Sequence, residues 1–469
     1  MRLSPLITML AALVALIIVG AVGARVLQPN RPLLMDAGFS LAKITPNADG
    51  SDDVTAIHYA LSRSATVTIT FTNKANGQRF VFRNAEVRPA DSYQVLFSGV
   101  VDGYTLPGDA IADQQIETRL IPNGVYDWTI EAVATGNTNG NNGETAHANG
   151  VLTVENADSD LPSITDFSIS PQTFTPNQDG VDDRVAINVS LAKDADLTVY
   201  LEGQDQQRYY IAERIEGRQP GERGAHIFDY DGGVDNSITP PPNGKYTVVA
   251  IAQDKAGQRV RRTGTLTLVD GGLPNAEIEA QSTGGTLFYT HAPYKESYMS
   301  SNAAPGEKIA LPVGVTSSRA SITFAQNDML IFRLTVSNYG STPLRTVGPW
   351  PGTVYQYDQQ AAAMGEEPIT GAWRVGLMCE QSDTPLPWRW AIGSPDQLQR
   401  VDREGQTLWY LPPGGKAVVW GAVRMTRLFK TRNPQECWAA LIHEDVAIPP
   451  LQSHVGAIKV ELTASDSAK

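Results

Sequence analysis

An internal repeat constrains this chain more than any other feature of its sequence. Residues 44–71 read ITPNADGSDDVTAIHYALSRSATVTITF, and residues 174–201 read FTPNQDGVDDRVAINVSLAKDADLTVYL. After the shared TPNxDGxDD frame, apolar residues alternate with polar or small ones, as in the run Val185, Ile187, Val189 and Leu191. A period of two with one apolar face indicates half-buried β-strands. The chain therefore contains two copies of one β-unit.

The two copies also end alike. Each contains a Pro-Asn-Gly-x-Tyr segment, at 122–126 and 242–246, followed by another apolar run. Pro-Asn-Gly favours a turn, because Asn and Gly tolerate positive φ. A Leu-Pro pair closes each copy, at 161–162 and 273–274. We therefore expect an N-terminal segment (1–27), two repeats of sandwich size (28–160 and 161–273) and a C-terminal domain (274–469).

These motifs resemble the Ig-like domain of the flagellar hook-capping protein, which recurs in bacterial exported and surface proteins. The resemblance rests on the opening TPNxDGxxD, on Tyr230-Asp231-Gly232 and on the closing PNGxY, and it covers about residues 36–270. It implies Ig-like sandwiches that act as spacers, assembly parts or adhesive stalks. The first copy departs from the pattern: it lacks Tyr-Asp-Gly and carries an Asn/Gly-rich stretch, Gly136–Gly150, that is typical of a loop.

The TPNxDGxDD segment allows two interpretations. Clustered oxygens could bind Ca²⁺, which takes six to eight oxygen ligands. Alternatively, the Asn and Asp side chains accept the N–H groups of their own turn, and Gly supplies positive φ. The EF-hand spacing fails, which favours the structural interpretation. The residues concerned are Asn47, Asp49, Asp52 and Asp53 in the first copy and Asn177, Asp179, Asp182 and Asp183 in the second.

The C-terminal third does not repeat the motif, but it also contains strand-like runs. They are Met329–Val336, Trp373–Met378, Thr407–Leu411, Ala417–Met425 and Ala457–Leu462. These runs predict a second, larger kind of β-sandwich with longer loops. The whole chain is thus expected to be all-β, with tandem Ig-like sandwiches, a C-terminal β-sandwich domain and one N-terminal hydrophobic helix.

Seven of the eight tryptophans lie in this C-terminal third. Exposed aromatic rings can stack on sugars, and Trp388 and Trp390, which we expect in a proline-rich loop, are the best candidates for ligand contact. The simpler interpretation is that these rings fill the core of a sandwich.

Cys379 and Cys437 are the only cysteines. Each lies beside a strand-like run, and neighbouring strands can bring two cysteines within bonding range. Two free thiols would be prone to oxidation outside the cell. We therefore predict a Cys379–Cys437 disulfide, the alternative being two buried thiols.

The N-terminus predicts export. Leu6–Ala24 is apolar except for Thr8 and is flanked by Arg2 and Arg25. A run of this length can be a single-pass membrane anchor, or a signal peptide that is cleaved to give a secreted protein. In both cases the rest of the chain is expected to be extracytoplasmic, at the cell surface.

Composition and motifs narrow the range of functions that the chain could have. A formal charge of −13 without a basic patch argues against nucleic-acid binding, and we expect no nucleic-acid partner. The six histidines are scattered, and no hydrolase, kinase or dinucleotide motif is present. We therefore expect no catalytic residues and no cofactor other than the possible Ca²⁺. The favoured function is a structural or adhesive stalk whose partners are the membrane and other surface proteins or glycans. The alternatives are a carbohydrate-binding surface protein and, less favoured, an enzyme of unrecognised class.

Overall fold

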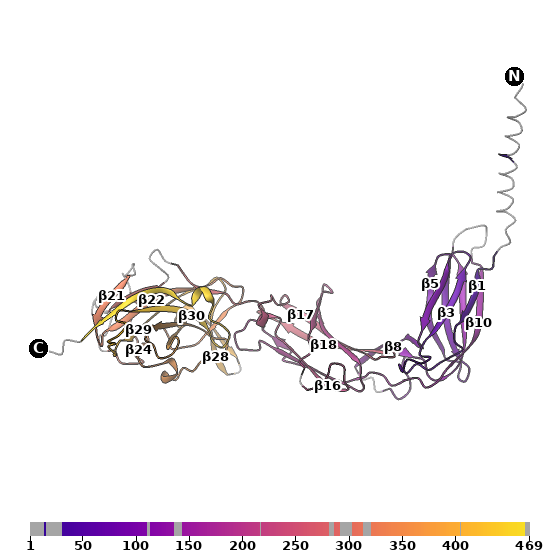
Figure 1. Ribbon diagram of the computed structural model, residues 1–469, viewed down its shortest axis with the longest axis horizontal. Helices are drawn as coiled ribbons and strands as arrows, with labels where there is room; N and C mark the ends of the chain where they lie inside the picture. Colours follow the sequence, from indigo (N-terminus) through magenta and orange to yellow (C-terminus); the bar gives the residue numbers. More distant parts are fainter. Residues whose placement is uncertain are drawn as a thin grey trace, which may run out of the picture.

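Three β-modules follow one another along the chain in the computed structural model (Figure 1). The structure describes residues 14–15, 31–109, 113–135, 143–215, 217–280, 286–290, 303–312, 320–403 and 405–464. Apart from Val14 and Ala15, the apolar run Leu6–Ala24 lies outside these residues. Within them, no helix is long and apolar enough to cross a membrane. From residue 31 onward the described part of the chain is all-β, as predicted, with only short 3-10 helices between strands.

The first module is a sandwich of two sheets that enclose one core. One sheet has three strands in the order β1 (Leu34–Phe39), β3 (Thr55–Leu61) and β6 (Ser92–Phe97). The other has the order β2 (Lys43–Ile44), β10 (Thr145–Val154), β9 (Gly124–Ala134), β4 (Ala65–Asn73) and β5 (Arg79–Arg88). The alternating residues of β3 and β4 point between the sheets, where Ile57, Ile69 and Phe71 have no exposed surface.

The second module repeats this topology strand for strand. Its three-stranded sheet has the order β11 (Ile164–Ser170), β13 (Val185–Leu191) and β16 (Gly224–Tyr230). The facing sheet contains β15 (Arg208–Ile211), β14 (Asp196–Glu202), β17 (Gly244–Gln253) and β18 (Arg259–Leu268), and β12 (Thr173–Phe174) pairs with β18 in parallel. A 3-10 helix, η1 (Val234–Asn236), follows β16. The sequence repeat is therefore a structural repeat.

The PNGxY segments end in equivalent contacts. The hydroxyls of Tyr126 and Tyr246 donate to the carbonyl oxygens of Pro122 and Pro242, four residues earlier. This contact is the tyrosine corner of Ig-like sandwiches, which pins the turn before the next strand.

The first copy differs in one segment. Between β6 and β9 it contains the hairpin β7 (Val100–Asp102) and β8 (Gln114–Leu120), where the second copy has Tyr230-Asp231-Gly232 and η1. This hairpin does not join either sheet of its own module. It pairs with β18 and extends the sheet of the second module (Figure 1).

The third module is a larger sandwich. One sheet has the order β19 (Ala276–Ile278), β22 (Met329–Asn338), β29 (Lys416–Arg424) and β24 (Val354–Gln356), with β20 (Thr286–Thr290) on β22. The other has the order β21 (Ser321–Ala325), β31 (Val455–Thr463), β30 (Gln435–His443), β25 (Trp373–Cys379), β23 (Leu344–Thr346), β28 (Gln406–Leu411) and β27 (Gln399–Arg403), with β26 (Trp388–Ala391) on β25. The described residues of its loops include the 3-10 helices η3 (Ala361–Met364), η4 (Pro395–Gln397) and η5 (Pro450–Gln452).

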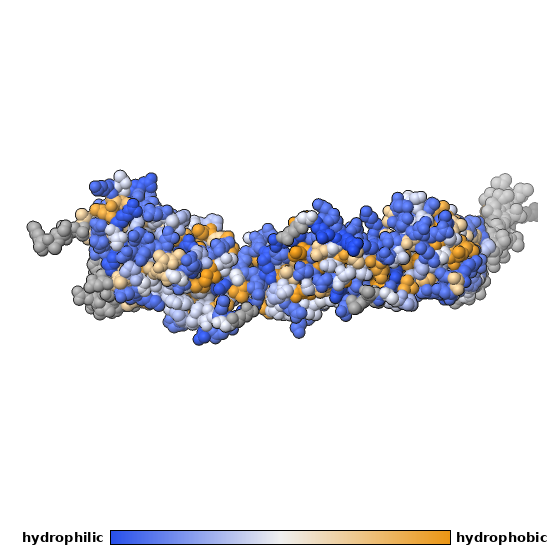
Figure 2. Space-filling view, turned by 90° about the horizontal axis from the view of Figure 1, so that it is seen from below, coloured by the Kyte–Doolittle hydropathy of each residue, from blue (hydrophilic) through white to orange (hydrophobic). Residues whose placement is uncertain are grey.

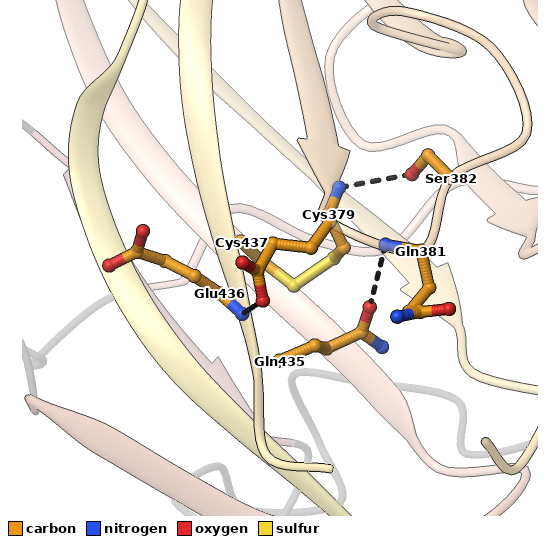
Figure 3. The surroundings of a disulfide bond; sticks show 7 residues. Cys379, Gln381, Ser382, Gln435, Glu436 and Cys437 are labelled. Carbon is orange, nitrogen blue, oxygen red and sulfur yellow. Dashed lines mark hydrogen bonds between the residues drawn. A yellow bond between two sulfur atoms is a disulfide. The ribbon is translucent and has the colours of Figure 1, made fainter. Parts of the chain in front are cut away.

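The predicted disulfide is confirmed. Cys379 and Cys437 are directly opposite each other on β25 and β30, and both are fully buried. Figure 3 shows the bond with its neighbours: the Cys379 N–H donates to the Ser382 hydroxyl, and the Gln381 N–H donates to the Gln435 side chain. The bond thus joins two central strands of the larger sheet.

Two sequence interpretations need correction. Trp388 and Trp390 have no exposed surface, because β26 pairs with β25 and directs both rings into the core. They cannot be the proposed sugar-contacting surface, and the core interpretation holds. In addition, Gly136–Gly150 is not all loop: residues 145–150 belong to β10 and pair with β9. Because several residues of that strand are small, its sequence shows no clear alternation of apolar and polar residues.

Candidate functional site at the domain junctions

The two TPNxDGxDD turns have the same internal hydrogen bonds. Asp53 and its counterpart Asp183 accept backbone N–H groups across the turn, including those of Gly50 and Gly180. The Asn47 and Asn177 side chains accept the N–H groups two residues on. These bonds are what the structural interpretation of the turns predicts. Among the described residues, no group of His, Cys, Asp and Glu is arranged to hold a metal ion.

Each turn also holds the linker to the next module. The carbonyl oxygens of Pro46 and Pro176 accept the N–H groups of Asp158 and Gly272, at equivalent places in the two linkers. Each turn therefore lies where its module meets the following one.

The surroundings of the two turns differ. In the first copy, Asp49 and Asp52 are exposed. In the second copy, Asn177 and Asp179 are only 2% and 6% exposed, because the third module packs against them. The sequence motif is the same, so the difference comes from the neighbouring module.

The third module contacts the second turn through four side chains. The Tyr410 hydroxyl donates to Asp179 Oδ2 at 2.9 Å, and Arg345 Nη1 donates to the Asp179 carbonyl oxygen at 3.0 Å. His443 Nε2 donates to the Gln178 carbonyl oxygen at 2.7 Å, and Arg403 forms an ion pair with Asp182. We call this contact the docking junction.

The backbones also approach closely at the docking junction. A Cβ atom on Gly371 would lie 2.2 Å from the Asp179 carbonyl carbon, and one on Gly180 would lie 2.1 Å from the Thr370 carbonyl oxygen. Both residues have positive φ. Glycine is required at both positions, for conformation and for space.

Burial at the docking junction changes the pKa values of its acids. Desolvation raises the pKa of Asp179 to about 6, with a further contribution from the nearby Asp183 charge. Desolvation also raises the pKa of Asp183 above its ordinary value, although backbone N–H groups oppose it. At the counterpart Asp53 in the first copy, desolvation is outweighed by the same kind of backbone bonds, and the pKa is lowered. Burial of the second turn therefore favours the protonated forms of the Asp179 and Asp183 carboxyl groups.

His443 has the opposite pH dependence. Burial lowers its pKa to about 4, although hydrogen bonds with the Gln178 and Gly371 backbones partly oppose this. Its ring stacks on Trp373 with centroids 4.3 Å apart. The stability that His443 contributes is present above its ordinary pKa of 6.5 and is lost as pH falls through about 4. The contribution of Asp179 is present below 3.8 and is lost as pH rises through about 6.

Single substitutions should expose these two opposed effects. In His443→Gln, acidification from pH 7 to pH 4.5 should stabilise the docking junction, because only the acids of the turn still titrate. In Asp179→Asn, the same acidification should destabilise the docking junction, because the protonation of His443 then has the larger effect on stability. The measurement is the thermal unfolding midpoint against pH. Identical pH profiles for both variants and the unsubstituted protein would contradict the assignment.

The turns also give a prediction about calcium. If their carboxylates serve mainly to accept backbone N–H groups, EDTA should change the thermal unfolding midpoint little. A bound ion would stabilise by RT ln(1 + [L]/Kd), about 2.7 kcal/mol at a hundredfold excess over Kd. Calorimetry with Ca²⁺ and with EDTA measures the difference. A large Ca²⁺-dependent shift that disappears in Asp49→Ala combined with Asp179→Ala would establish the calcium interpretation instead.

The junction between the first and second modules is built from strand pairing. Residues Gln114–Thr118 of β8 pair with Arg259–Arg262 of β18. The Ile116 side chain packs against the core of the second module, and Glu117 forms a 2.9 Å ion pair with Arg259. The two modules therefore share one sheet.

A buried glutamine completes this first junction. Gln258 has no exposed surface, and its Nε2 donates to the carbonyl oxygens of Asp158 and Asp160 in the linker. Lys193 forms 2.8 Å ion pairs with both Asp158 and Asp254. These bonds fix the linker against the second module.

Sequence reasoning found part of these junctions and missed the rest. It singled out Asp179, Asp182 and Asp183, which the structure brings to the docking junction, and Asn47, Asp49, Asp52 and Asp53, which remain on the open turn. It did not single out Tyr410, Arg345 or Gln258. No motif or pattern in the neighbouring sequence distinguishes these three residues.

Comparison with known proteins gives only distant similarities. No family model matches the chain, and no curated protein matches it. Among solved structures, it is similar to a Ca²⁺-stabilized adhesin that helps an Antarctic bacterium reach out and bind ice, at 14% identity and a TM-score of 0.21, over 91% of this chain and 72% of that one.

Two further structures have comparable values. A tetra-tandem repeat from the extending region of a large adhesion protein has 11% identity and a TM-score of 0.17, over 92% of this chain and 75% of that one. Cadherin domains 3–6 of protocadherin gamma B2 have 12% identity and a TM-score of 0.15, over 92% and 100%. Similarity at this level carries no inference about what the present chain binds.

Proposed function

We propose that this chain is a non-catalytic extracytoplasmic structural protein, in which the two Ig-like repeats form a stiff stalk that presents the C-terminal β-domain. The observation that carries the proposal is the construction of both junctions. A shared sheet joins the first two modules, and a buried turn with four side-chain contacts joins the last two. Modules held in this way keep a fixed separation, as a stalk requires.

The linkers support the same function. A flexible linker leaves its backbone to water, whereas both linkers here are bonded to the modules that they leave. The Ala157 N–H donates to the Asn123 side chain, and the Gly271 N–H donates to the Asn243 side chain, at equivalent positions. The side of the molecule in Figure 2 is mostly blue and white with orange patches on each module, a mixture that is normal for a protein surface in water.

Stiffness can be tested with spin labels on the full chain. Ala75, Gln207 and Asp396 are exposed, and one lies in each module. Cysteines introduced pairwise at these positions and labelled should give narrow distance distributions between modules. Distributions as broad as those of a flexibly linked chain would overturn the stalk.

The location of the protein needs a separate experiment. Protease added to intact spheroplasts should digest the modules, because export would place them outside the cytoplasmic membrane. N-terminal sequencing of the mature protein separates an uncleaved anchor from a cleaved signal peptide, with a start at Arg25 indicating cleavage. Full protection from the protease would overturn the proposed location.

A further inference from the structure

The C-terminal module contains a cavity of about 280 Å³ that the stalk function does not use. It lies on the outer face of the larger sheet, beside β25 and β26. The segment around η3 forms one wall, and the proline-rich segment 384–387 forms another. Its lining includes Arg374, Arg389, Ala362, Thr384, Leu386 and Pro387. We call it the arginine cavity.

Strand register explains why two arginines meet there. Arg374 is opposite Ala391, and Arg389 is opposite Gly376, on the antiparallel pair β25 and β26. Since side chains two residues apart share a face, both arginines project from the face opposite the core tryptophans. The space over Gly376 is filled by neighbouring side chains: a Cβ atom there would lie 2.7 Å from the Ile442 Cδ1 and 3.0 Å from the Leu386 Cβ.

One carboxylate serves both arginines. Glu444 is 3% exposed and lies 3.5 Å from Arg374 Nη1 and 2.7 Å from Arg389 Nη1. Arg374 has no exposed surface, and desolvation lowers its pKa although Glu444 opposes this. Glu366 acts on Arg374 from farther away and, in the described part of the chain, forms an ion pair with neither arginine. Counted by ion pairs, two arginines therefore share a single carboxylate.

In addition, not every hydrogen-bond donor of these two arginines has a partner. Arg374 donates to the carbonyl oxygens of Val347 and Glu367 as well as to Glu444. Arg389 donates from Nε to the Leu386 carbonyl oxygen and from Nη1 to Glu444. Its Nη2 has no hydrogen-bond partner among the described residues, and its side chain remains 24% exposed. A guanidinium edge at the cavity is thus free to donate.

We propose that the arginine cavity binds a small carboxylate-bearing molecule about the size of one acidic sugar. Arginine forms its strongest hydrogen bonds with carboxylates and phosphates. Two arginines that share one ion-paired carboxylate suit a monoanion, whereas a dianion would be repelled more strongly by Glu444 and Glu366. The volume is near the lower end for ligand pockets, about 300–1,000 Å³, so one small ring fits. The apolar and proline walls would contact the ring of such a ligand.

This proposal goes beyond the stalk function and does not depend on it. The spin-label distances measure the junctions between modules, whereas ligand binding measures one cavity within the third module. Each can fail while the other holds.

The test is calorimetric titration of the full chain with D-glucuronate, with D-glucose as the neutral counterpart. Glucuronate should bind saturably at one site, and glucose should not. Arg389→Gln should weaken glucuronate binding by about tenfold or more, since it removes a charge-assisted hydrogen bond. Arg427→Gln is the matched control, because Arg427 is an exposed arginine of the same module outside the cavity, and it should bind as the unsubstituted protein does.

A second variant keeps the test decisive if Arg389→Gln does not fold. Ala362 is exposed and lines the cavity, so Ala362→Trp should fill it without changing any charge. This variant should keep the unfolding midpoint and lose glucuronate binding. Absence of saturable glucuronate binding, equal binding of glucose, tighter binding of inorganic phosphate, or unchanged glucuronate binding by Ala362→Trp would each overturn the proposal.

Discussion

Gly371→Ala will separate the C-terminal module from the second repeat. The Cβ atom of alanine would lie 2.2 Å from the Asp179 carbonyl carbon and 2.3 Å from the Gly180 nitrogen, and neither backbone atom can rotate away. The two backbones must move apart, and the bonds that Tyr410 and Arg345 make with Asp179 should be lost with them. We expect the narrow distance distribution between labels at Gln207 and Asp396 to become broad.

Gly365→Ala provides a matched control. Gly365 has φ of +81°, almost the same as the +80° of Gly371, but a Cβ atom there would meet nothing within 4 Å. Both variants carry the same backbone strain, of order 1 kcal/mol, and only Gly371→Ala adds the collision. A narrow distance distribution in Gly371→Ala, or an equally broad one in Gly365→Ala, would contradict the role of this close approach.

The open turn of the first copy gives an internal reference for the docked turn of the second. The hydrogen bonds within the two turns are the same, so they cannot account for the opposite pKa shifts of Asp53 and Asp183. The difference is burial: the third module contacts Asp179 through Tyr410 and Arg345, and η1, which the first copy lacks, contacts Gln178 of the same turn. The acidic motif is thus a stable turn on its own and a docking element where a complementary module follows.

The sequence predicted most of what depends on neighbouring residues. Alternation of apolar and polar residues identified β13 and β3, because the periodicity of a strand depends only on consecutive residues. The disulfide was predictable because only two cysteines exist and each lay at a strand-like run. The Asn and Asp side chains of the turns bond to N–H groups within six residues, so their structural role was also visible.

The junctions were not predictable for the opposite reason. Arg345 and Tyr410 reach Asp179 across 166 and 231 residues, and no local pattern marks a residue that will contact another module. The hairpin of β7 and β8 looked like part of its own repeat, but its pairing partner β18 belongs to the next one. Strand periodicity indicates which residues face a core and does not indicate which sheet the strand will join.

Trp390→Ala will destabilise the C-terminal module strongly, by about 3–5 kcal/mol, as truncation of a fully buried tryptophan does. The Trp390 ring packs edge-on against Phe332 and Tyr355, with centroids 4.6 Å and 4.9 Å away, and its Nε1 donates to the Thr353 carbonyl oxygen at 3.0 Å. The variant therefore leaves a large cavity between the two sheets and removes one of the two hydrogen bonds that the Thr353 carbonyl oxygen accepts, the other coming from the Ala422 N–H. Denaturant unfolding of the module measures the loss.

Trp438→Ala is the comparison that makes this result specific. Trp438 is half-buried on the same module and stacks on His454 with centroids 4.2 Å apart, so its loss should cost much less stability. A large difference between the two variants follows from the position of Trp390 between the sheets. If Trp390→Ala instead kept full stability and lost binding of a glycan, the ring would have to face solvent. Because β26 pairs with β25 in a register that directs Trp390 into the core, we expect the loss of stability.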